Sequence, residues 1–423
     1  MKIAWLINIV MPEVADRLGL WKTSLGGWLI GQLNGIKETN NELHIISVSK
    51  DITELQKIKI DNVHYYLIPD GKDTSLEKSL SNVLSEMEYD IFHIFGTESS
   101  ASYVAAKISD SKRTVVSIQG LVSMCAKHVG DDIPEYYYRK TLLKRFGKKV
   151  LNVSIIEDDA IRLSKNGERE KQIIKGARHI IGRTTWDRAC VYQINPDADY
   201  YVCREILRES FYTDKWSFDN CEKHTIFLSQ SASPIKGLHR VMEALPLVIE
   251  HYPDTQVYIA GAPLSDFSRR GKLKGKMVEY FCGYQGYIEK LVRENGLYGR
   301  LHFLNYLDEN EMRKQYLKAN VFVLSSSIEN SPNSLGEAMI LGVPCIASCV
   351  GGIQDMLHAP SEGFMFPADE PYMLAYYICK IFESKETAKS ISEKARNHAL
   401  LTHNIKENTK DLLEIYKIIE SEK

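Results

Sequence analysis

The chain has 423 residues, which is too long for one hydrophobic core, so two domains of roughly 200 residues each are expected. Hydrophobic residues make up 44% and charged residues 26%, as in ordinary globular proteins, and no run approaches the roughly 18 apolar residues of a membrane-spanning helix. The formal net charge of -2 argues against nucleic acid as a partner. Eight scattered cysteines without a C-x-x-C pair indicate reduced thiols in a cytoplasmic protein.

In the first half of the chain, strand-like runs alternate with stretches of helical spacing. The predicted strands cover 2–10, 43–49, 62–69, 90–95, 113–119 and 179–184, and the predicted helices cover 25–38, 75–88 and 100–108. This alternation predicts parallel βαβ units and a doubly wound sheet. The apolar start is interpreted as the first buried strand rather than a signal peptide, because no small-residue cleavage pattern follows it.

A long, polar, helical segment replaces this pattern between about 121 and 178, and residues 204–222 have no clear period. A second α/β series follows, with predicted strands at 224–229, 255–262, 301–307, 321–326 and 343–348. The spacing of Ile405, Leu412, Tyr416 and Ile419 predicts a terminal amphipathic helix. We therefore expect an α/β protein of two Rossmann-like, doubly wound domains that face each other across a cleft. The expected boundaries are 1–205 for the N-terminal domain, 206–222 for the linker, 223–400 for the C-terminal domain and 401–423 for the terminal helix.

Ligands of doubly wound sheets bind outside the carboxyl ends of the strands, and Lys236-Gly237 occupies such a place after the strand at 224–229. The ammonium group can meet an anion there, while the glycine lets the backbone approach closely. A solvated surface lysine is the alternative interpretation.

The stretch SPNSLGEAM (331–339) predicts a helix whose first N–H groups, on Asn333, Ser334 and Leu335, favour phosphate. The same stretch also fits a capping box between Ser334 and Glu337, which is a purely structural interpretation.

Glycine pairs mark two further turns into helices. Gly26-Gly27 precede a helix in the first half, and Gly351-Gly352 follow the strand at 343–348, where a turn with positive φ explains them equally well. A G-x-G-x-x-G motif is absent, so a nicotinamide cofactor has little support. Several helix ends and one lysine facing one cleft predict a diphosphate that is held without a metal.

The ordered set of motifs is similar to that of retaining family 4 glycosyltransferases with the GT-B fold, of the type found in bacterial polysaccharide synthesis. The strongest piece is IENSPNSLGEAMILGVPCIASCVGG (328–352), which resembles the family's E-x7-E segment and the turn after it. KGLHRVMEAL (236–245), the stretch 286–327 and DIFHIFGTES (90–99) follow the family's order and spacing. The likeness covers most of the chain.

This resemblance implies a role for each matching residue in binding a nucleoside-diphosphate sugar of the hexose type. Glu337 would bind the ribose hydroxyls, Glu329 would contact hydroxyls of the donor sugar, and Lys236, beside Gly237, would neutralise the diphosphate. The N–H groups around Asn333, Ser334 and Leu335 and the loop at Gly26 and Gly27 would assist Lys236. The first half would bind the acceptor, and the terminal helix would cross back onto the first domain. The resemblance also implies retention of anomeric configuration and no metal.

Two positions depart from the family pattern. Ser231 stands where relatives carry an arginine, and Gln119 stands where they often carry a histidine. Arg240, one helical turn after Lys236, could compensate for the missing arginine, but we expect it to be a surface residue. Gln119 and His93 are the acceptor-side candidates, with a satisfied core histidine as the alternative for His93. The departures motivate two other hypotheses: a catalytically silent subunit that binds nucleotide sugar, and an epimerase of UDP-sugars on the same fold.

The segment from Tyr136 to Arg178 holds twelve Lys or Arg against five acidic residues, a local balance of +7. Its start, YYYRKTLLKRFGKKV, interleaves cations with aromatic and apolar residues, a pattern typical of surfaces that rest on anionic lipid. The family resemblance makes a lipid-linked saccharide acceptor at the inner face of the plasma membrane a natural expectation. A solvated helical insertion is the alternative.

Overall fold

The structure is a computed structural model that describes residues 1–21, 26–151, 155–262 and 283–422. By its internal contacts the chain divides into two compact units. Unit 1 comprises Met1–Ser123, Lys165–Arg208 and Thr402–Lys423, and unit 2 comprises Met124–Ser164 and Glu209–Leu401. Residues 124–164, which were expected in the N-terminal domain, therefore group with unit 2.

Unit 1 is built on an eight-stranded sheet in the order β3-β4-β2-β1-β5-β6-β7-β8. The strands are β1 (Lys2–Ile7), β2 (Glu42–Ser49), β3 (Gln56–Ile60), β4 (Val63–Pro69), β5 (Ile91–Phe95), β6 (Thr114–Ser117), β7 (His179–Gly182) and β8 (Asp199–Val202). Only the β3–β4 pair is antiparallel among these strand pairs, and β1 pairs in parallel with β2 and β5. The short strands β3 and β8 were not predicted, because β3 alternates lysine with isoleucine and β8 has just four residues.

Helices cover both faces of the sheet in unit 1. They are α1 (Pro12–Leu18), α2 (Gly27–Lys37), α3 (Asp73–Ser85), α4 (Ser100–Ile108), α9 (Thr185–Ile194), α17 (Ile405–Ser421) and the second half of α8 (Ile156–Gly176). Because successive side chains of a strand point to opposite faces, Trp5 of β1 packs in the core with α2 and α17, while Leu6 packs in the core with α3 and α4. Burial on both faces explains why the strands read as continuous apolar runs.

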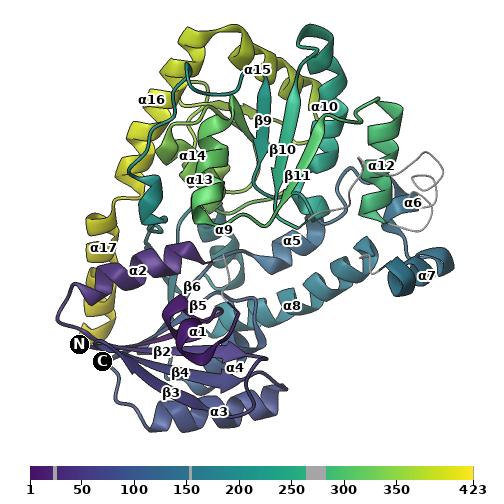
Figure 1. The fold of residues 1–423 in the computed structure, drawn as a ribbon. Coiled ribbons are helices and arrows are strands. Elements are labelled where there is room, and N and C mark those ends of the chain that lie inside the picture. The colour runs from purple at the N-terminus through teal and green to yellow at the C-terminus, as the bar shows by residue number, and fades with distance from the viewer. Residues whose placement is uncertain (22–25, 152–154, 263–282, 423) are drawn as a thin grey trace. The chain divides into compact units, whose positions relative to one another are not determined.

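The terminal helix α17 packs against unit 1, beside α2 (Figure 1). Its buried side chains include Leu412, Tyr416 and Ile419, as the helical spacing predicts. The indole N–H of Trp5 donates to the hydroxyl of Tyr416 over 3.0 Å, so a buried polar contact fixes the helix in addition to its apolar face.

Unit 2 contains a six-stranded sheet in the order β11-β10-β9-β12-β13-β14, and its neighbouring strands pair in parallel. The strands are β9 (Thr225–Leu228), β10 (Gln256–Ala260), β11 (Leu301–Asn305), β12 (Val321–Leu324), β13 (Cys345–Ser348) and β14 (Phe364–Phe366). Numbered along the unit, this is the order 3-2-1-4-5-6 of a Rossmann fold. The three-residue strand β14 was not predicted.

The helical elements of unit 2 connect these strands or belong to the segment that precedes them. They are α5 (Val122–His128), α6 (Glu135–Tyr138), α7 (Leu142–Leu151), η1 (Glu209–Phe211), η2 (Pro234–Lys236), α10 (Leu238–His251), α12 (Tyr284–Glu294), α13 (Glu309–Lys318), α14 (Asn333–Leu341), η4 (Ile353–Asp355), α15 (Pro371–Glu383) and α16 (Lys385–Thr402). None of the helices in the described part of the chain has the length and apolar character needed to cross a bilayer. The expectation of two Rossmann-like α/β domains is confirmed.

Candidate functional site

The strand order of unit 2 reverses between β9 and β12, and a crevice opens at such a switch point in doubly wound sheets. The loop after β9 leads into η2, which ends at Lys236, and the loop after β12 carries Glu329. Two residues that the sequence places 93 positions apart therefore meet at the point where this fold binds ligands.

Lys236 and Glu329 form an ion pair at this point. The Nζ atom of Lys236 lies 2.6 Å from Oε1 of Glu329, and the hydroxyl of Ser326 donates to the same oxygen over 2.7 Å. The side chains are 28% and 11% exposed, respectively. The lysine is therefore held in a fixed, partly desolvated position, and the alternative of a solvated surface lysine is wrong.

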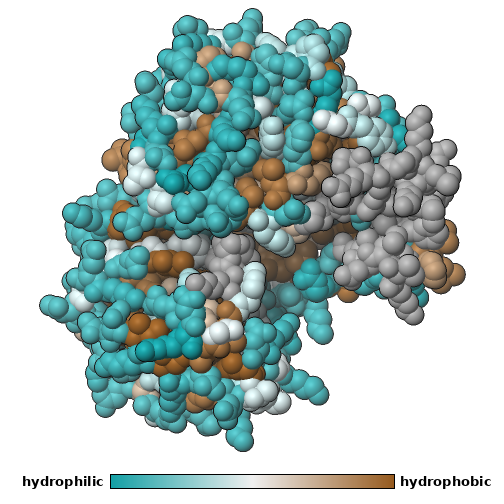
Figure 2. Space-filling model, in the orientation of Figure 1, coloured by the Kyte–Doolittle hydropathy of each residue, from teal (hydrophilic) through white to brown (hydrophobic). Residues whose placement is uncertain are grey.

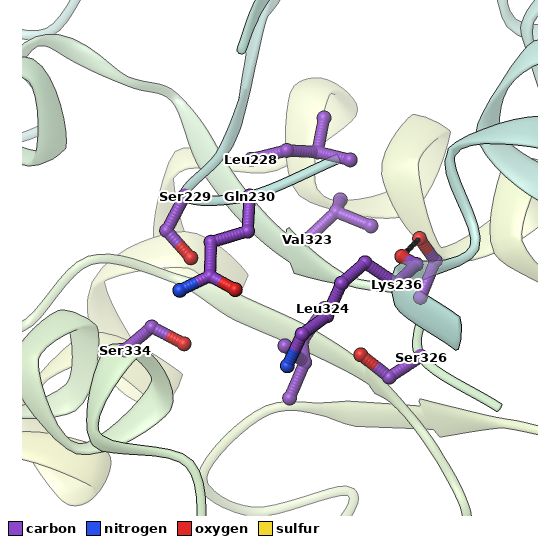
Figure 3. Close-up of a pocket in the computed structure, with 9 residues that line it drawn as sticks. Leu228, Ser229, Gln230, Lys236, Val323, Leu324, Ser326 and Ser334 are labelled. Carbon is purple, nitrogen blue, oxygen red and sulfur yellow. Dashed lines mark hydrogen bonds between the residues drawn. The ribbon is translucent and has the colours of Figure 1, made fainter. Parts of the chain in front are cut away.

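A small pocket with an empty volume of about 250 Å³ surrounds the ammonium group. It is lined by Leu228, Ser229, Gln230, Lys236, Val323, Leu324, Ser325, Ser326 and Ser334. Figure 3 shows the amide of Gln230 and the ammonium of Lys236 both extending into the space between the strand ends and Ser334. An ammonium, an amide and several hydroxyls are donors that together suit an anion such as a phosphate group.

Sequence reasoning predicted Lys236 and Ser334 but missed Ser229, Gln230 and Ser326. Their positions at strand ends could have identified them, because Ser229-Gln230 directly follows β9 and Ser326 lies two residues after β12.

Gly237 allows the backbone of η2 to contact the loop after β12. Its φ is 68°, and a Cβ at this position would overlap the carbonyl oxygen of Ser325. The hydroxyl of Ser325 donates to the carbonyls of Lys236 and Gly237 over 3.1 and 3.0 Å, and the N–H of Ser327 donates to the carbonyl of Ile235 over 2.7 Å. The glycine thus fixes the position of Lys236 through the backbone.

The Gly351-Gly352 turn supports Glu329 in a similar way. Gly351 has a φ of 52°, a Cβ there would overlap the carbonyl oxygen of Glu329, and the N–H of Gly352 donates to that oxygen over 3.0 Å. The turn interpretation of this glycine pair is therefore correct, and the turn is followed by the three-residue element η4.

Arg240 is buried, which corrects the expectation that it lies on the surface. It is 1% exposed, and its guanidinium donates from Nη1 to the carbonyl of Ser325 over 2.9 Å. Its Nε and Nη2 atoms donate to Oδ2 of Asp132 over 3.1 and 2.5 Å. Arg240 therefore ties the Ser325 backbone to segment 124–164, although it does not line the pocket. Ser231, at the position where the family resemblance implies an arginine, is fully buried, and its hydroxyl has no hydrogen-bond partner among the described residues.

The helix α14 begins at Asn333, two positions earlier than a capping box with Ser334 as the N-cap would require. Pro332 is the N-cap residue and Ser334 lies inside the helix, so the capping box is wrong. The N–H of Leu335 donates to the carbonyl of Pro332 over 3.0 Å, so it is not free as expected. Asn333 and Ser334 stay the candidate donors, because the first N–H groups of a helix have no partner within it. Glu337 is buried in the second turn, and its ribose contact stays a prediction.

Gly26 and Gly27 lie at the start of α2 in unit 1. Gly26 is the N-cap residue with a φ of 78°, and a Cβ on Gly26 or Gly27 would overlap the side chain of Ile9 or Arg208, respectively. Residues 22–25 of the same loop lie outside the described residues. The proposed contact of this loop with the donor stays a prediction.

His93 is a core residue. It is fully buried, Nδ1 lies 2.6 Å from the hydroxyl of Tyr416 and Nε2 lies 2.5 Å from the hydroxyl of Ser117. Both ring nitrogens of His93 therefore have a hydroxyl partner. Burial lowers the pKa of His93 to about 3. With both nitrogens occupied, His93 has no polar atom left to contact an acceptor.

Gln119 lies in the loop after β6, and its backbone carbonyl accepts a hydrogen bond from Nη2 of Arg183 over 2.6 Å. Arg183 also pairs with Glu205, and both side chains are nearly fully buried. Burial raises the pKa of a further carboxyl, Glu98, which lies beside Gln119 at the Gly96 turn. Sequence reasoning missed these three charged residues, because nothing in the local pattern distinguishes them from solvated ones.

Two groups of three side chains in the described part of the chain have the composition and closeness to hold a metal ion: His358, Glu362 and His398, and His179, Asp199 and Glu422. None of the six lines the pocket around Lys236. Independence from metal stays a prediction for the proposed reaction.

Residues 213–398 match the sequence family described as glycosyl transferases group 1. This segment covers most of unit 2 and is similar to that family of enzymes. The chain is 25% identical over 185 residues to the D-inositol 3-phosphate glycosyltransferase of Corynebacterium urealyticum, an alignment that spans 43% of this chain and only 40% of that relative. It is 21% identical to an uncharacterized glycosyltransferase of Methanocaldococcus jannaschii over 99% of this chain and 98% of that protein.

The fold of the glycosyltransferase is similar to that of HepE from Anabaena in a complex with UDP-glucose. The TM-score is 0.65 with 15% sequence identity, and the match covers 98% of this chain and 99% of HepE. At this identity the likeness concerns the fold alone, and it confirms the GT-B architecture.

Proposed function

We propose that this glycosyltransferase moves a hexose-type sugar from a nucleoside-diphosphate sugar to a saccharide acceptor, with retention of configuration and without a metal. The observation that carries the proposal is the Lys236–Glu329 pair at the switch point of unit 2, beside a pocket lined by hydrogen-bond donors. The fold relative HepE was solved with UDP-glucose, which supports a nucleotide sugar as the donor.

In the proposed reaction, negative charge grows on the departing diphosphate while the sugar becomes oxocarbenium-like. Lys236 has three N–H donors, so it can keep its bond to Glu329 and still donate to a phosphate oxygen. The attraction between a fixed cation and the diphosphate becomes stronger as negative charge grows on the diphosphate. The activation barrier of the transfer is therefore lowered, and no protein group has to move during the reaction. Oε1 of Glu329 already accepts hydrogen bonds from Lys236 and Ser326. We therefore propose that Oε2 accepts the hydrogen bond from a hydroxyl of the donor sugar. The departing phosphate deprotonates the acceptor hydroxyl.

The proposal is tested by a thermal-shift screen of UDP-, GDP-, ADP- and dTDP-glucose, followed by NMR of the products formed with a panel of saccharide acceptors. A binding donor should raise the melting temperature by mass action. The α-anomeric signal of the donor should persist in the product, and EDTA should not reduce the rate. An inverted product, or a rate that requires added metal, would contradict the mechanism.

A buried serine, Ser231, at the place where the family resemblance implies an arginine favours one alternative, a silent subunit that binds nucleotide sugar. The same screen separates the two functions. Saturable binding of a donor without turnover on any acceptor would support the silent subunit, whereas conversion of the donor sugar without acceptor would indicate an epimerase.

We further propose that the acceptor is lipid-linked and that the protein meets it at the cytoplasmic face of the membrane through α7. Leu142 and Phe146 of this helix are 81% and 60% exposed, and Figure 2 shows brown atoms over α7 at the right edge of the view. An amphipathic helix with exposed apolar residues and neighbouring cations is typical of a membrane-surface contact.

The structure also changes which residues would carry such a contact. Lys144 is buried and its ammonium donates to the carbonyls of Tyr136 and Arg139, while Asp158 pairs with both Lys140 and Lys148. Lys140, Lys144 and Lys148 are therefore already engaged within the protein, and the exposed apolar residues of α7 become the main candidates for the membrane contact.

Flotation with vesicles of phosphatidylglycerol and phosphatidylcholine tests the contact. Replacing Leu142 and Phe146 by Ser should abolish flotation, whereas replacing the exposed Leu401 by Ser should not. Lys144 is left intact, because its substitution would disturb the fold. Equal flotation of both variants and the wild type would exclude α7 as the contact.

A further inference from the structure

Two histidines and one glutamate of unit 2 gather outside the pocket around Lys236. His358 and Glu362 belong to the connection between η4 and β14, and His398 lies near the end of α16. One ligand atom of each residue lies within 4.8 Å of the ligand atoms of the other two. The proposed sugar transfer uses none of these three side chains, so their arrangement calls for a separate explanation.

Both imidazole rings direct a nitrogen at the same carboxylate. Nδ1 of His358 lies 3.2 Å from Oε1 of Glu362, and Nδ1 of His398 lies 2.9 Å from Oε2. The two rings are stacked, with their centroids 4.5 Å apart and their planes inclined by 13°. Neighbouring ligand atoms around a tetrahedral zinc ion with bonds of about 2.0 to 2.1 Å lie about 3.3 Å apart. The separations between the nitrogens and the carboxylate oxygens are therefore close to those within a metal site.

The carboxylate of Glu362 is fixed by its own loop. The N–H of His358 donates to Oε2 of Glu362 over 3.0 Å, and the N–H of Glu362 donates to the carbonyl of His358 over 2.9 Å. The hydroxyl of Ser361 donates to the same carbonyl over 3.0 Å. Burial raises the pKa of Glu362, but the N–H of His358 and the imidazole of His398 lower it by more, so the carboxyl group is ionised at neutral pH. A preformed anionic ligand thus stands between the two imidazoles.

The charges around this group leave room for a cation. In the part of the chain that the structure describes, the ion-pair partners of Glu362 are the two imidazoles, and no lysine or arginine pairs with it. The second group with metal-binding composition differs, because the guanidinium of Arg178 lies 2.5 Å from Oε2 of Glu422 and 3.6 Å from Oδ2 of Asp199. Arg178 already supplies a positive charge there, whereas the group around Glu362 has no such permanent cation among the described residues.

We propose that His358, Glu362 and His398 bind a zinc ion through the two Nδ1 atoms and one carboxylate oxygen. Two nitrogens and one oxygen suit zinc, whereas Mg²⁺ and Ca²⁺ prefer oxygen ligands alone. The side chain of His358 is 57% exposed, so water can complete the coordination. On binding, each imidazole loses the proton on Nδ1 and carries one on Nε2 instead.

The bound ion joins the loop before β14 to α16 and thereby stabilises unit 2. None of its ligands lines the pocket around Lys236, so zinc should change stability and leave the rate of sugar transfer unchanged. This role is separate from the proposed function and does not depend on it.

Zinc titration of the tag-free chain, stripped of metal with EDTA and transferred to chelator-free buffer, tests the site. All proteins carry Cys349→Ser, because this exposed thiol is a competing zinc ligand. Competition with a chromogenic zinc indicator should show a site that His358→Ala and His398→Gln weaken by at least about tenfold, since even the outer partners of metal ligands are worth that much. The matched control His251→Ala, which removes an exposed histidine of α10, should keep the affinity.

Two further measurements report on the ligands themselves. Zinc should raise the melting temperature of the parent protein, and equal concentrations of Mg²⁺ should not. Co²⁺ should give the visible absorption of a tetrahedral site, and His358→Ala should abolish it. The exposed position of His358 lets this variant fold normally, and circular dichroism without metal verifies that it does. Absence of zinc binding, or equal zinc affinity of the parent and His358→Ala, would overturn the proposal.

Discussion

The two switch points of this glycosyltransferase have the same topology but differ in how firmly their side chains are held. In unit 2, the loops after β9 and β12 are joined by backbone contacts around Gly237, and the central cation is already paired with Glu329. In unit 1, where the strand order reverses between β1 and β5, the loops frame a wide pocket, and its lining residues Trp21, Asp51 and Asp70 are exposed. The fixed ion pair of unit 2 is consistent with the proposed role of Lys236 in stabilising charge during the reaction.

Lys236→Ala should have the largest effect, because it removes the cation proposed to meet the departing diphosphate. We expect kcat to fall by about 10² to 10³, as is usual when one preorganised stabilising group is lost. Lys314→Ala, an exposed lysine of α13, is the control for steady-state kinetics. An equal kcat for wild type and Lys236→Ala would refute the assigned role.

Gly237→Ala tests whether the order of unit 2 depends on close backbone contact. The new Cβ would overlap the carbonyl of Ser325, so the loop must shift, and the free energy of unfolding and the affinity for donor should both decrease. Gly299→Ala is the matched control, since Gly299 also has a positive φ, 79°, but has no atom near its Cβ position. The control should lose only the conformational cost of about 1 to 2 kcal/mol. Chemical unfolding measures the free energy of unfolding, and titration with donor measures the affinity. Equal decreases for Gly237→Ala and Gly299→Ala would show that the close contact with Ser325 does not matter.

Arg240→Met should disturb the same loop from outside the pocket. The substitution leaves the carbonyl of Ser325 and the half-exposed Asp132 without their hydrogen-bond donor. We therefore expect the free energy of unfolding to fall by about 1 to 3 kcal/mol and the KM for the nucleotide sugar to rise. A double-mutant cycle with Asp132→Asn measures the coupling of segment 124–164 to the loop. Additive losses in the cycle would mean that the two residues act independently.

Acid should destabilise both units through one buried histidine each. Burial lowers the pKa of His93 in unit 1 and of His239 in unit 2 to about 3. Between pH 6.5 and 3 the unfolded chain binds protons that the folded chain does not, so stability falls as the pH falls. The slope is about 1.4 kcal/mol per pH unit for each histidine. Urea unfolding at pH 7, 6 and 5 should show a shallower dependence for His93→Gln, and an unchanged slope would contradict the assignment.

The local parts of the site were accessible from the sequence. Lys236 and Gly237 follow a recognisable strand, and the stretch around Asn333 has the composition of a helix start. The sequence misjudged Arg240, because a basic residue at the start of a helix has no local feature that shows whether it is buried. It also gave no indication that Trp21 and Asp70, from different loops, line one pocket.

The sequence by itself determined the alternation of strands and helices, since side-chain periodicity is a local property and central strands such as β5 and β12 are buried on both faces. Only the tertiary structure decided which strand ends are neighbours. Strand order brings Lys236 to Glu329 and Asp132 to Arg240, over separations of 93 and 108 residues. Such contacts depend on the pairing of the whole sheet and on the burial it creates, and no window of the chain contains that information.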